Sequence, residues 1–314
     1  MRILITGATG YIGLAVLRRI AESHEPVAMV RKSSRTELLP PSTETIEGDI
    51  TDKESLRSAL EGIDAVAHLA GVNPGSKNSS QVVSEVDKDT FTTVNVEGTQ
   101  NIVEAAAQAD VNSFVYTSTT NAHPDVSYDY ESMYVDTKRQ AGDVVANSSL
   151  DYTIVHPTYV MGPCDYRLKR YDEFRLAAAN MMLIPPLYTP GKINIVHVDT
   201  LADSIIHYLE EPTGSRHLVS GANINRRQYA RHLASLSDRR SLVLPLPFHQ
   251  ALLPFIVRVV DSIGLADISV DSLALNEQTG TVPEIHEKRA PVERKLWKQA
   301  VTDTYRWYQD VRLL

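Results

Sequence analysis

Tyr134 and Lys138 are the residues of this chain whose types and spacing best suit proton transfer. They stand four apart in the stretch YVDTK, and on a helix this spacing puts both side chains on one face. A lysine ammonium near a phenol stabilises the phenolate, which lowers the pKa of a tyrosine from about 10 towards neutrality. The pair is therefore a candidate general acid and base.

Hydroxyl groups follow the apolar stretch FVYT. The β-branched and aromatic residues of Ser113–Thr117 predict a strand, and Ser118 and Thr119 come directly after it. In doubly wound folds, ligands bind at the carboxyl edge of the sheet. A hydroxyl at that edge would hold a substrate carbonyl while Tyr134 passes a proton to or from its oxygen.

Three glycines lie where the first predicted strand, Arg2–Thr6, turns into a helix. Gly7, Gly10 and Gly13 are spaced three apart, which is one residue longer than the common Gly-x-Gly-x-x-Gly pattern. Glycines here allow a tight turn, close approach of the backbone to a pyrophosphate, and close packing of helix on strand. The helix start then binds the phosphates. The alternative is a structural turn without a ligand.

Arg31 follows the second predicted strand, Pro26–Val30. A carboxylate at this place would bind the ribose 2′-hydroxyl of NAD and repel a 2′-phosphate. Arg31 offers several donors instead, and Lys32 and Ser33 add charge and a hydroxyl beside it, so the segment favours NADP. The alternative is a surface arginine without a ligand. Asp49, after the third strand, is placed to meet the adenine edge.

The first half of the chain alternates short β-branched runs with longer helical patterns. This alternation is typical of a parallel sheet with helices on both faces. Six strands with crossovers are enough for a Rossmann-type doubly wound α/β sheet. The strands are expected at Arg2–Thr6, Pro26–Val30, Thr45–Glu47, Ala65–His68, Ser113–Thr117 and Tyr152–His156.

After residue 157 the regular alternation fades and prolines cluster. We predict a dinucleotide-binding Rossmann domain over residues 1–160 and a smaller, irregular, mainly substrate-binding region over 161–314. A strand and a helix near 193–211 are expected to return to the main domain. An amphipathic helix is predicted over 251–268, because Pro254, Arg258 and Asp261 interrupt this apolar segment.

Composition excludes several classes of partner. The 314 residues carry a net charge of −8, which argues against a nucleic acid and against an anionic membrane surface. The single cysteine, Cys164, makes no internal disulfide, and the chain begins with strand-like sequence, so a cytoplasmic location is predicted. No histidine pair has metal-ligand spacing, and no metal is expected.

Motifs along nearly the whole chain resemble those of the extended short-chain dehydrogenase/reductase family. TGATGYIG, EGDITD, AVAHLAG, VNVEGTQNIVEAA, FVYTSTT, YVDTK, IVHPTYVMGP and IVHVDTLADSI follow in the family's order. The resemblance implies that Tyr134 is the general acid/base and that Lys138 lowers its pKa and binds the nicotinamide ribose. The catalytic serine or threonine falls on Thr119, with Ser118 as the alternative.

The resemblance also implies a set of cofactor contacts. They are Gly7, Thr9, Gly10, Tyr11, Ile12, Gly13, Arg31, Lys32, Ser33, Asp49, Ile50, Leu69, Ala70, Gly71, Asn95, Thr117, Tyr134, Lys138, Pro157 and Thr158. Two features depart from the family. The stretch from Thr119 to Tyr134 is shorter than usual, and Arg31 differs from the NAD-retaining epimerases.

The function predicted from these residues is an NADP(H)-dependent oxidoreductase that transfers hydride to or from a carbonyl or alcohol carbon of a small-molecule substrate. One alternative is an NAD-retaining sugar-nucleotide epimerase or dehydratase. Another is a non-catalytic sensor that binds NADP. A homodimer through the helices near 99–109 and 138–148 is possible, as in relatives.

Overall fold

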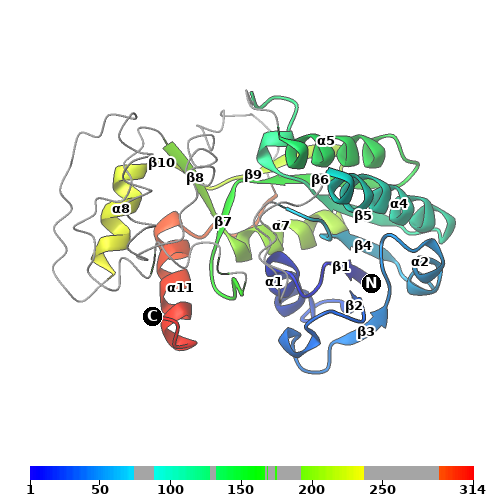
Figure 1. The fold of residues 1–314 in the computed structure, drawn as a ribbon, viewed down its shortest axis with the longest axis horizontal. Helices are drawn as coiled ribbons and strands as arrows, with labels where there is room; N and C mark the ends of the chain where they lie inside the picture. The colour runs from blue at the N-terminus through cyan, green and yellow to red at the C-terminus, as the bar shows by residue number, and fades with distance from the viewer. Residues whose placement is uncertain (74–87, 128–131, 167, 169–173, 175–191, 237–289) are drawn as a thin grey trace.

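A seven-stranded parallel sheet forms the centre of the computed structural model, which describes residues 1–73, 88–127, 132–166, 168, 174, 192–236 and 290–314. The strand order is β3-β2-β1-β4-β5-β6-β9 (Figure 1). The predicted Rossmann-type sheet is confirmed, and the six predicted strands match within a residue at each end. The strands are β1 (Arg2–Thr6), β2 (Glu25–Val30), β3 (Glu44–Glu47), β4 (Ala65–His68), β5 (Ser113–Thr117), β6 (Tyr152–Pro157) and β9 (Ser215–Val219).

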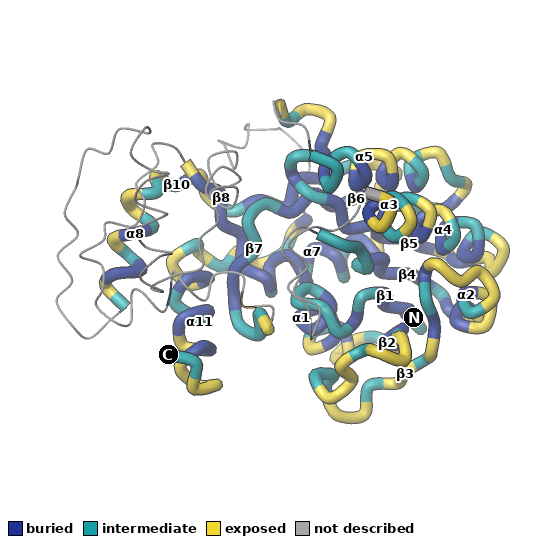
Figure 2. Tube along the Cα trace, viewed as in Figure 1, coloured by how far each residue is buried: buried dark blue, intermediate teal, exposed yellow. Residues whose placement is uncertain are grey.

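Helices cover both faces of this sheet, and each face has its own apolar core. One core lies beneath α1 (Tyr11–Ile20) and α7 (Val198–Glu210). The other lies beneath α2 (Lys53–Ala59), α4 (Gly98–Gln108) and α5 (Met133–Ala146). Apart from the exposed edge strand β3, the strands are largely buried, while the outer helix faces carry exposed residues (Figure 2).

The helix before β5 contains a π-helical stretch. α3 (Lys88–Phe91) runs into η2 (Thr92–Glu97), a π-helix, and then into α4. Such stretches are rare and often occur at functional sites. Two short 3-10 helices, η1 (Thr36–Leu38) and η3 (Thr120–Ala122), lie in the part of the chain that forms the seven-stranded sheet.

A second, three-stranded sheet lies beside the main one. It contains β7 (Tyr159–Met161), β8 (Lys192–His197) and β10 (Ala222–Asn225). A third apolar cluster joins it to α8 (Arg226–Ser235) and α11 (Trp297–Asp310). β8 pairs within this sheet, parallel to β7 and antiparallel to β10, whereas the next helix, α7, packs on the main sheet. The proposed division at residue 160 stays a prediction.

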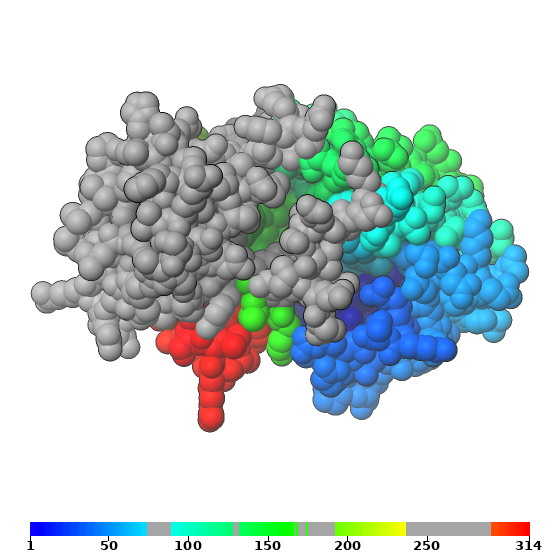
Figure 3. Space-filling view, viewed as in Figure 1, coloured from blue at the N-terminus to red at the C-terminus, as the bar shows by residue number. Residues whose placement is uncertain are grey.

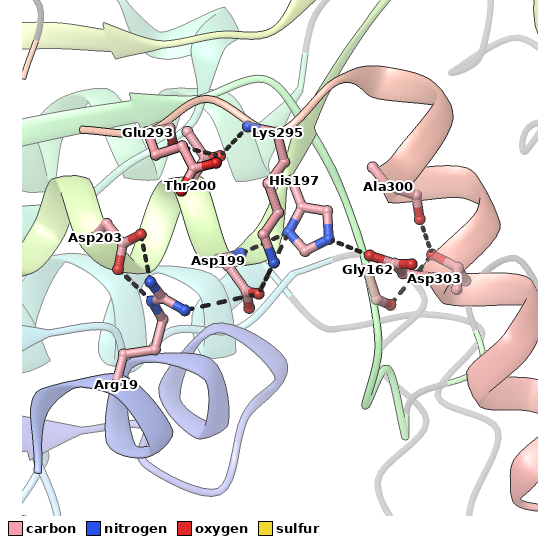
Figure 4. Close-up of polar contacts among 11 residues, drawn as sticks. Arg19, Gly162, His197, Asp199, Thr200, Asp203, Glu293, Lys295, Ala300 and Asp303 are labelled. Atoms are coloured by element: carbon pink, nitrogen blue, oxygen red, sulfur yellow. Dashed lines mark hydrogen bonds and ion pairs between the residues drawn. The ribbon is translucent and has the colours of Figure 1, made fainter. Parts of the chain in front are cut away.

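A polar network joins α1 and α7 to the C-terminal segment (Figure 4). The Asp199 carboxylate accepts a 2.6 Å hydrogen bond from Lys295 Nζ and lies 3.9 Å from the Arg19 guanidinium. His197 is fully buried; its Nδ1 accepts from the Asp199 N–H at 3.0 Å, and its Nε2 lies 3.2 Å from Asp303 Oδ2. Burial lowers the pKa of His197, which keeps the ring neutral and the cap of α7 intact.

The surface of the described main lobe is continuous from the N-terminal residues, in blue, to α4 and α5, in cyan and green (Figure 3). Within the described residues, no helix has the length and apolar character needed to cross a bilayer. The helix predicted over 251–268 lies outside the described residues.

Candidate functional site at the carboxyl edge of the sheet

The glycine loop makes a turn that only small residues allow. Gly7 has φ +68°, and a Cβ added there would lie 2.8 Å from the backbone N of Ala70. A Cβ on Gly13 would lie 2.4 Å from the Gly7 carbonyl oxygen. Gly10 donates its N–H to that same oxygen at 2.9 Å and caps α1 without a side-chain bond. Because the first turn of α1 carries no acidic residue, its N–H groups suit an anion.

A chain of buried hydrogen bonds fixes the loop after β4 against the glycine loop. Thr6 Oγ1 accepts from the Ala70 N–H at 3.1 Å and lies 2.7 Å from His68 Nδ1. His68 Nε2 lies 3.0 Å from Thr99 Oγ1, which donates to the Asn95 carbonyl. Burial lowers the pKa of His68 to about 3, so the ring is a neutral connector. Among the described residues, no group of three or more metal-ligating side chains occurs.

Asn95, in the π-helical stretch, joins the same loop to α5. Its Oδ1 accepts from the Val72 N–H at 2.8 Å, and its Nδ2 donates to the Val72 carbonyl at 3.0 Å. The same amide donates to Thr137 Oγ1 at 3.2 Å. Asn95 therefore holds the position of α5 relative to the end of β4.

Lys138 reaches the loop after β4 from the inner face of α5. Its Nζ lies 4.3 Å from the centroid of the Tyr116 ring, and a Cβ on Gly71 would lie 3.6 Å from it. No carboxylate pairs with this ammonium within the described residues, and burial lowers the pKa of Lys138 to about 7. Tyr134 lies one helical turn earlier, with its ring centroid 6.5 Å from that of Phe91.

The two candidate hydroxyls differ in their surroundings. Ser118 is buried, and its Oγ lies 3.5 Å from the Lys138 carbonyl. Thr119 is half-buried, and the part of the chain that the structure describes offers no hydrogen bond to its hydroxyl. The Thr119 carbonyl accepts from the Ala122 N–H at 3.0 Å and lies 2.9 Å from His156 Nδ1. The hydroxyl of Thr119 is thus the one available to a ligand.

Two further hydroxyls at this edge are buried without a partner among the described residues. These are Thr117 Oγ1, at the end of β5, and Thr158 Oγ1, just after β6. The carbonyl of Pro157, the last residue of β6, accepts a hydrogen bond from Thr120 Oγ1 at 2.6 Å. Buried polar groups normally have partners, so the two threonines are suited to a ligand with polar atoms.

The other end of the edge carries the basic segment after β2. Arg31 has no side-chain hydrogen bond or ion pair within the described residues, whereas Lys32 Nζ lies 3.5 Å from a Glu47 carboxylate oxygen and both are exposed. Asp49 Oδ1 accepts from the Thr51 N–H and hydroxyl at 2.9 and 2.8 Å, so it shapes a turn after β3. Neighbouring predicted contacts are the exposed Ser33, the half-buried Thr9 and the buried Ile50.

Tyr11 and Ile12 offer only backbone groups to the loop, because their side chains pack against the core beneath α1 and α7. The Tyr11 hydroxyl is buried and makes no hydrogen bond with the described residues. Burial, with the Asp165 and Asp199 carboxylates nearby, raises the pKa of Tyr11 well above its usual value. Nothing in the motif TGATGYIG indicates this orientation.

These features together fit a dinucleotide. A Cβ at Gly7 or Gly13 would occupy space beside the loop, and the N-terminus of α1 faces this loop. The unpaired ammonium of Lys138 and the unpaired hydroxyls of Thr117 and Thr158 lie along one edge of the described structure. The Gly7–Gly13 loop and α1 would hold the phosphates, and Lys138 would hold a ribose. The edge lies between β1 and β4, where the strand order reverses and ligands of this fold bind. Fold and site thus define a dinucleotide-binding Rossmann protein.

Comparison with known proteins assigns the family. A family model described as NAD(P)H-binding matches residues 7–170, just over half of the chain. The chain therefore belongs to this NAD(P)H-binding family, as an NAD(P)-dependent enzyme of the extended short-chain dehydrogenase/reductase type.

Three known proteins are similar to this chain in sequence or in fold. Sterol demethylase protein B of Methylococcus capsulatus is 28% identical over 265 residues, which cover 79% of this chain and 78% of that protein. The 2-alkyl-3-oxoalkanoate reductase of Stenotrophomonas maltophilia is 28% identical over 226 residues, 67% of this chain and 64% of the relative, which is just under two thirds of its length. The crystal structure of Thermus thermophilus UDP-glucose 4-epimerase in complex with NAD shares the fold, with 19% identity and a TM-score of 0.66 over 98% of this chain and 99% of that chain.

Proposed function

We propose that the protein is an NADPH-dependent reductase of a small-molecule carbonyl compound. One observation carries the proposal: the buried ammonium of Lys138, without a carboxylate partner in the described residues, lies beside the Gly71 loop, one helical turn after Tyr134. The available hydroxyl of Thr119 follows β5 at the same edge. A similar reductase of a 3-oxo acid supports carbonyl reduction over other chemistry.

Each group has one role in the proposed reaction. When bound, the nicotinamide supplies the hydride that reduces the carbonyl carbon. The Thr119 hydroxyl donates a hydrogen bond to the carbonyl oxygen, and the Tyr134 phenol gives that oxygen a proton, so the product is an alcohol. Lys138, in its charged form, stabilises the resulting phenolate. Thr117 and Thr158 would offer their hydroxyls to the nicotinamide end of the cofactor.

The choice of NADPH rests on Arg31. Its guanidinium has no partner within the described residues, and no acidic side chain stands at the end of β2. A free guanidinium suits a 2′-phosphate because it donates two parallel hydrogen bonds to it. Calorimetric titration with NADPH and with NADH checks this assignment. We expect tighter binding of NADPH and loss of the difference in Arg31→Asp, while Arg35→Asp, four residues on, keeps it. Equal affinities in the unmodified protein contradict the assignment.

Turnover tests the catalytic assignment. We expect a panel of an aldehyde, a ketone and a β-keto ester to include a compound that oxidises NADPH with formation of the alcohol. Tyr134→Phe keeps the affinity for NADPH and loses at least a hundredfold in turnover, since general acid catalysis contributes about 10²–10⁴. Undiminished turnover in this variant removes Tyr134 from the role.

A sugar-nucleotide epimerase or dehydratase is the second candidate, because the chain shares its fold with a UDP-glucose 4-epimerase bound to NAD. Such an enzyme keeps NAD and returns the hydride to its substrate. NAD that stays bound through purification, with a product at the oxidation level of UDP-glucose, favours this candidate. Arg31 counts against it.

Three coarser expectations complete the proposal. We propose that residues 161–314 supply most of the substrate contacts, that the chain works in the cytoplasm, and that it forms a homodimer through α4 and α5. Light scattering in solution measures the mass, and a monomeric mass at micromolar concentration contradicts the dimer.

A further inference from the structure

The backbone hydrogen bonds between β5 and β6 give way to side-chain hydrogen bonds where the candidate site begins. Ser118 still donates its N–H to the Val155 carbonyl at 2.8 Å, as parallel strands do. The next donor of such a ladder would be the N–H of residue 157, but Pro157 has none. From this point side chains make the connections, beginning with the 2.6 Å bond from the Thr120 hydroxyl to the Pro157 carbonyl.

His156 lies between the Ser118–Val155 bond and the Thr120–Pro157 bond and also joins the two strand ends. Its ring is fully buried, and Nδ1 lies 2.9 Å from the carbonyl oxygen of Thr119. Because a carbonyl only accepts, Nδ1 carries the proton, and Nε2 is left with a lone pair. Nε2 makes no hydrogen bond with the described residues. Burial lowers the pKa of His156 to about 3, so the ring keeps this neutral form at ordinary pH.

The surroundings of the ring fix its orientation. The His123 ring, itself buried, packs edge-on against it with the centroids 4.8 Å apart. The Thr119 backbone is extended, with φ −143° and ψ 152°, and its carbonyl also accepts from the Ala122 N–H. Two donors on one carbonyl hold the peptide plane that follows Thr119, and the direction of the Thr119 side chain is set by that plane.

We infer that His156 is a positioning residue that acts through Thr119. Its Nδ1–H anchors the Thr119 carbonyl and so holds the Thr119 hydroxyl where it meets the substrate oxygen. His156 itself touches neither substrate nor cofactor in this scheme. The inference rests on the proposed function, because it assigns to Thr119 the substrate-binding hydroxyl. It explains a buried histidine that uses only one of its two ring nitrogens among the described residues.

Two substitutions separate the hydrogen bond from the bulk of the ring. His156→Leu removes the donor and fills the space with apolar atoms. His156→Asn places an amide N–H near the position of Nδ1 and keeps the donor. His217→Leu is the control, because it removes another buried histidine, from the adjacent strand β9, whose Nε2 lies 2.8 Å from the Thr213 hydroxyl and not near the Thr119 carbonyl.

The kinetic experiment uses NADPH and the best carbonyl compound of the panel above. We expect His156→Leu to lower kcat by about 10- to 100-fold, since misplacing a reacting group by about 1 Å can cost 10²-fold. The dissociation constant for NADPH stays within about twofold in all variants, because the glycine loop is untouched. His156→Asn restores most of the turnover, and His217→Leu keeps that of the unmodified enzyme.

A double-mutant cycle with Thr119→Ala makes the test specific. If His156 acts through the Thr119 hydroxyl, then His156→Leu adds no further loss once that hydroxyl is absent. A general structural role would give the same loss in both backgrounds. Nitrogen-15 NMR of the free protein gives a second measurement: the His156 ring should show the neutral Nδ1–H tautomer from pH 5 to 8.

The outcomes are distinct for the two proposals. One outcome overturns the positioning role and leaves the proposed function standing. In it, Thr119→Ala lowers turnover, but His156→Leu either leaves turnover unchanged or lowers it by the same factor with and without the Thr119 hydroxyl. An Nε2–H tautomer or titration of His156 near pH 6.5 overturns the positioning role alone in the same way. No turnover of any carbonyl by the unmodified enzyme, or an unaffected Thr119→Ala variant, overturns the assignment to Thr119 and the positioning role together.

Discussion

Lys138 makes the stability of the cofactor-free protein depend on pH in a predictable direction. Its ammonium is buried above the Tyr116 ring and has no carboxylate partner within the described residues. Burial lowers the pKa of Lys138 from 10.5 to about 7. The charged form of Lys138 is therefore disfavoured in the folded state, whereas in the unfolded state its pKa has the ordinary value. Lys138→Met removes this contribution to the pH dependence of stability.

The magnitude follows from the two pKa values. Between pH 7 and 10.5 the unfolded chain binds a proton on Lys138 that the folded chain has lost, so stability rises with pH in this window. The slope is about 1.4 kcal/mol for each pH step of one, or ~2 kcal/mol between pH 7 and 9. Below pH 7 both states are protonated and the full penalty, on the order of 5 kcal/mol as an upper bound, remains.

Urea unfolding without cofactor at pH 7, 8 and 9 measures this. We expect the free energy of unfolding of the unmodified protein to rise relative to that of Lys138→Met by ~2 kcal/mol over the range, with the variant more stable at pH 7. Lys192→Met, which removes an exposed lysine, is the control and should parallel the unmodified protein. Parallel curves for the unmodified protein and Lys138→Met would refute the reasoning.

Three further predictions concern the groups around this site. Gly13→Ala puts a Cβ against the Gly7 carbonyl, where only backbone can yield; we expect a loss of about 1–3 kcal/mol of stability and at least tenfold weaker NADPH binding by calorimetry. Asn95→Ala leaves both backbone groups of Val72 without their partner, and urea unfolding should show a loss of about 1–3 kcal/mol. Lys295→Met breaks a partly exposed ion pair and should cost less than about 1 kcal/mol in a thermal melt; a larger loss would mean that the network in Figure 4 is cooperative.

The main sheet was predictable because five of the six predicted strands are short apolar runs that are largely buried. The sixth, β3, is an exposed edge strand with the sequence ETIE. The seventh, β9, was missed. Its sequence, SRHLV, has two polar residues in the middle, and their partners are distant in the chain. Arg216 bonds to Asp143 on α5, and the His217 ring stacks on Tyr208 of α7. Such a strand is stabilised by tertiary contacts that single-sequence patterns do not contain.

The site divides in the same way. The helical spacing of Tyr134 and Lys138 and the turn at the three glycines could be predicted, because each depends on the spacing within a short stretch of the chain. Contacts that join elements could not. The bonds of Asn95 to the loop after β4, and of His156 to the end of β5, connect residues 23 and 37 positions apart. Pro157 was the available signal, since a proline at a strand end stops the backbone ladder and requires side chains to continue it.

Three neutral polar residues, Asn95, His68 and His156, thus fix the loops that carry the proposed reacting groups. Hydrogen bonds are directional, and a buried partner left unpaired costs about 1–3 kcal/mol, so these contacts fix orientation more strictly than apolar packing does. The pKa values of both histidines lie at about 3, which keeps their donors and acceptors unchanged from pH 5 to 9. The anchors therefore do not titrate in the range where Lys138 does. An inflection near pH 7 in cofactor binding that disappears in Lys138→Met would thus report on Lys138 itself, and one that persists would have to come from a group elsewhere in the chain.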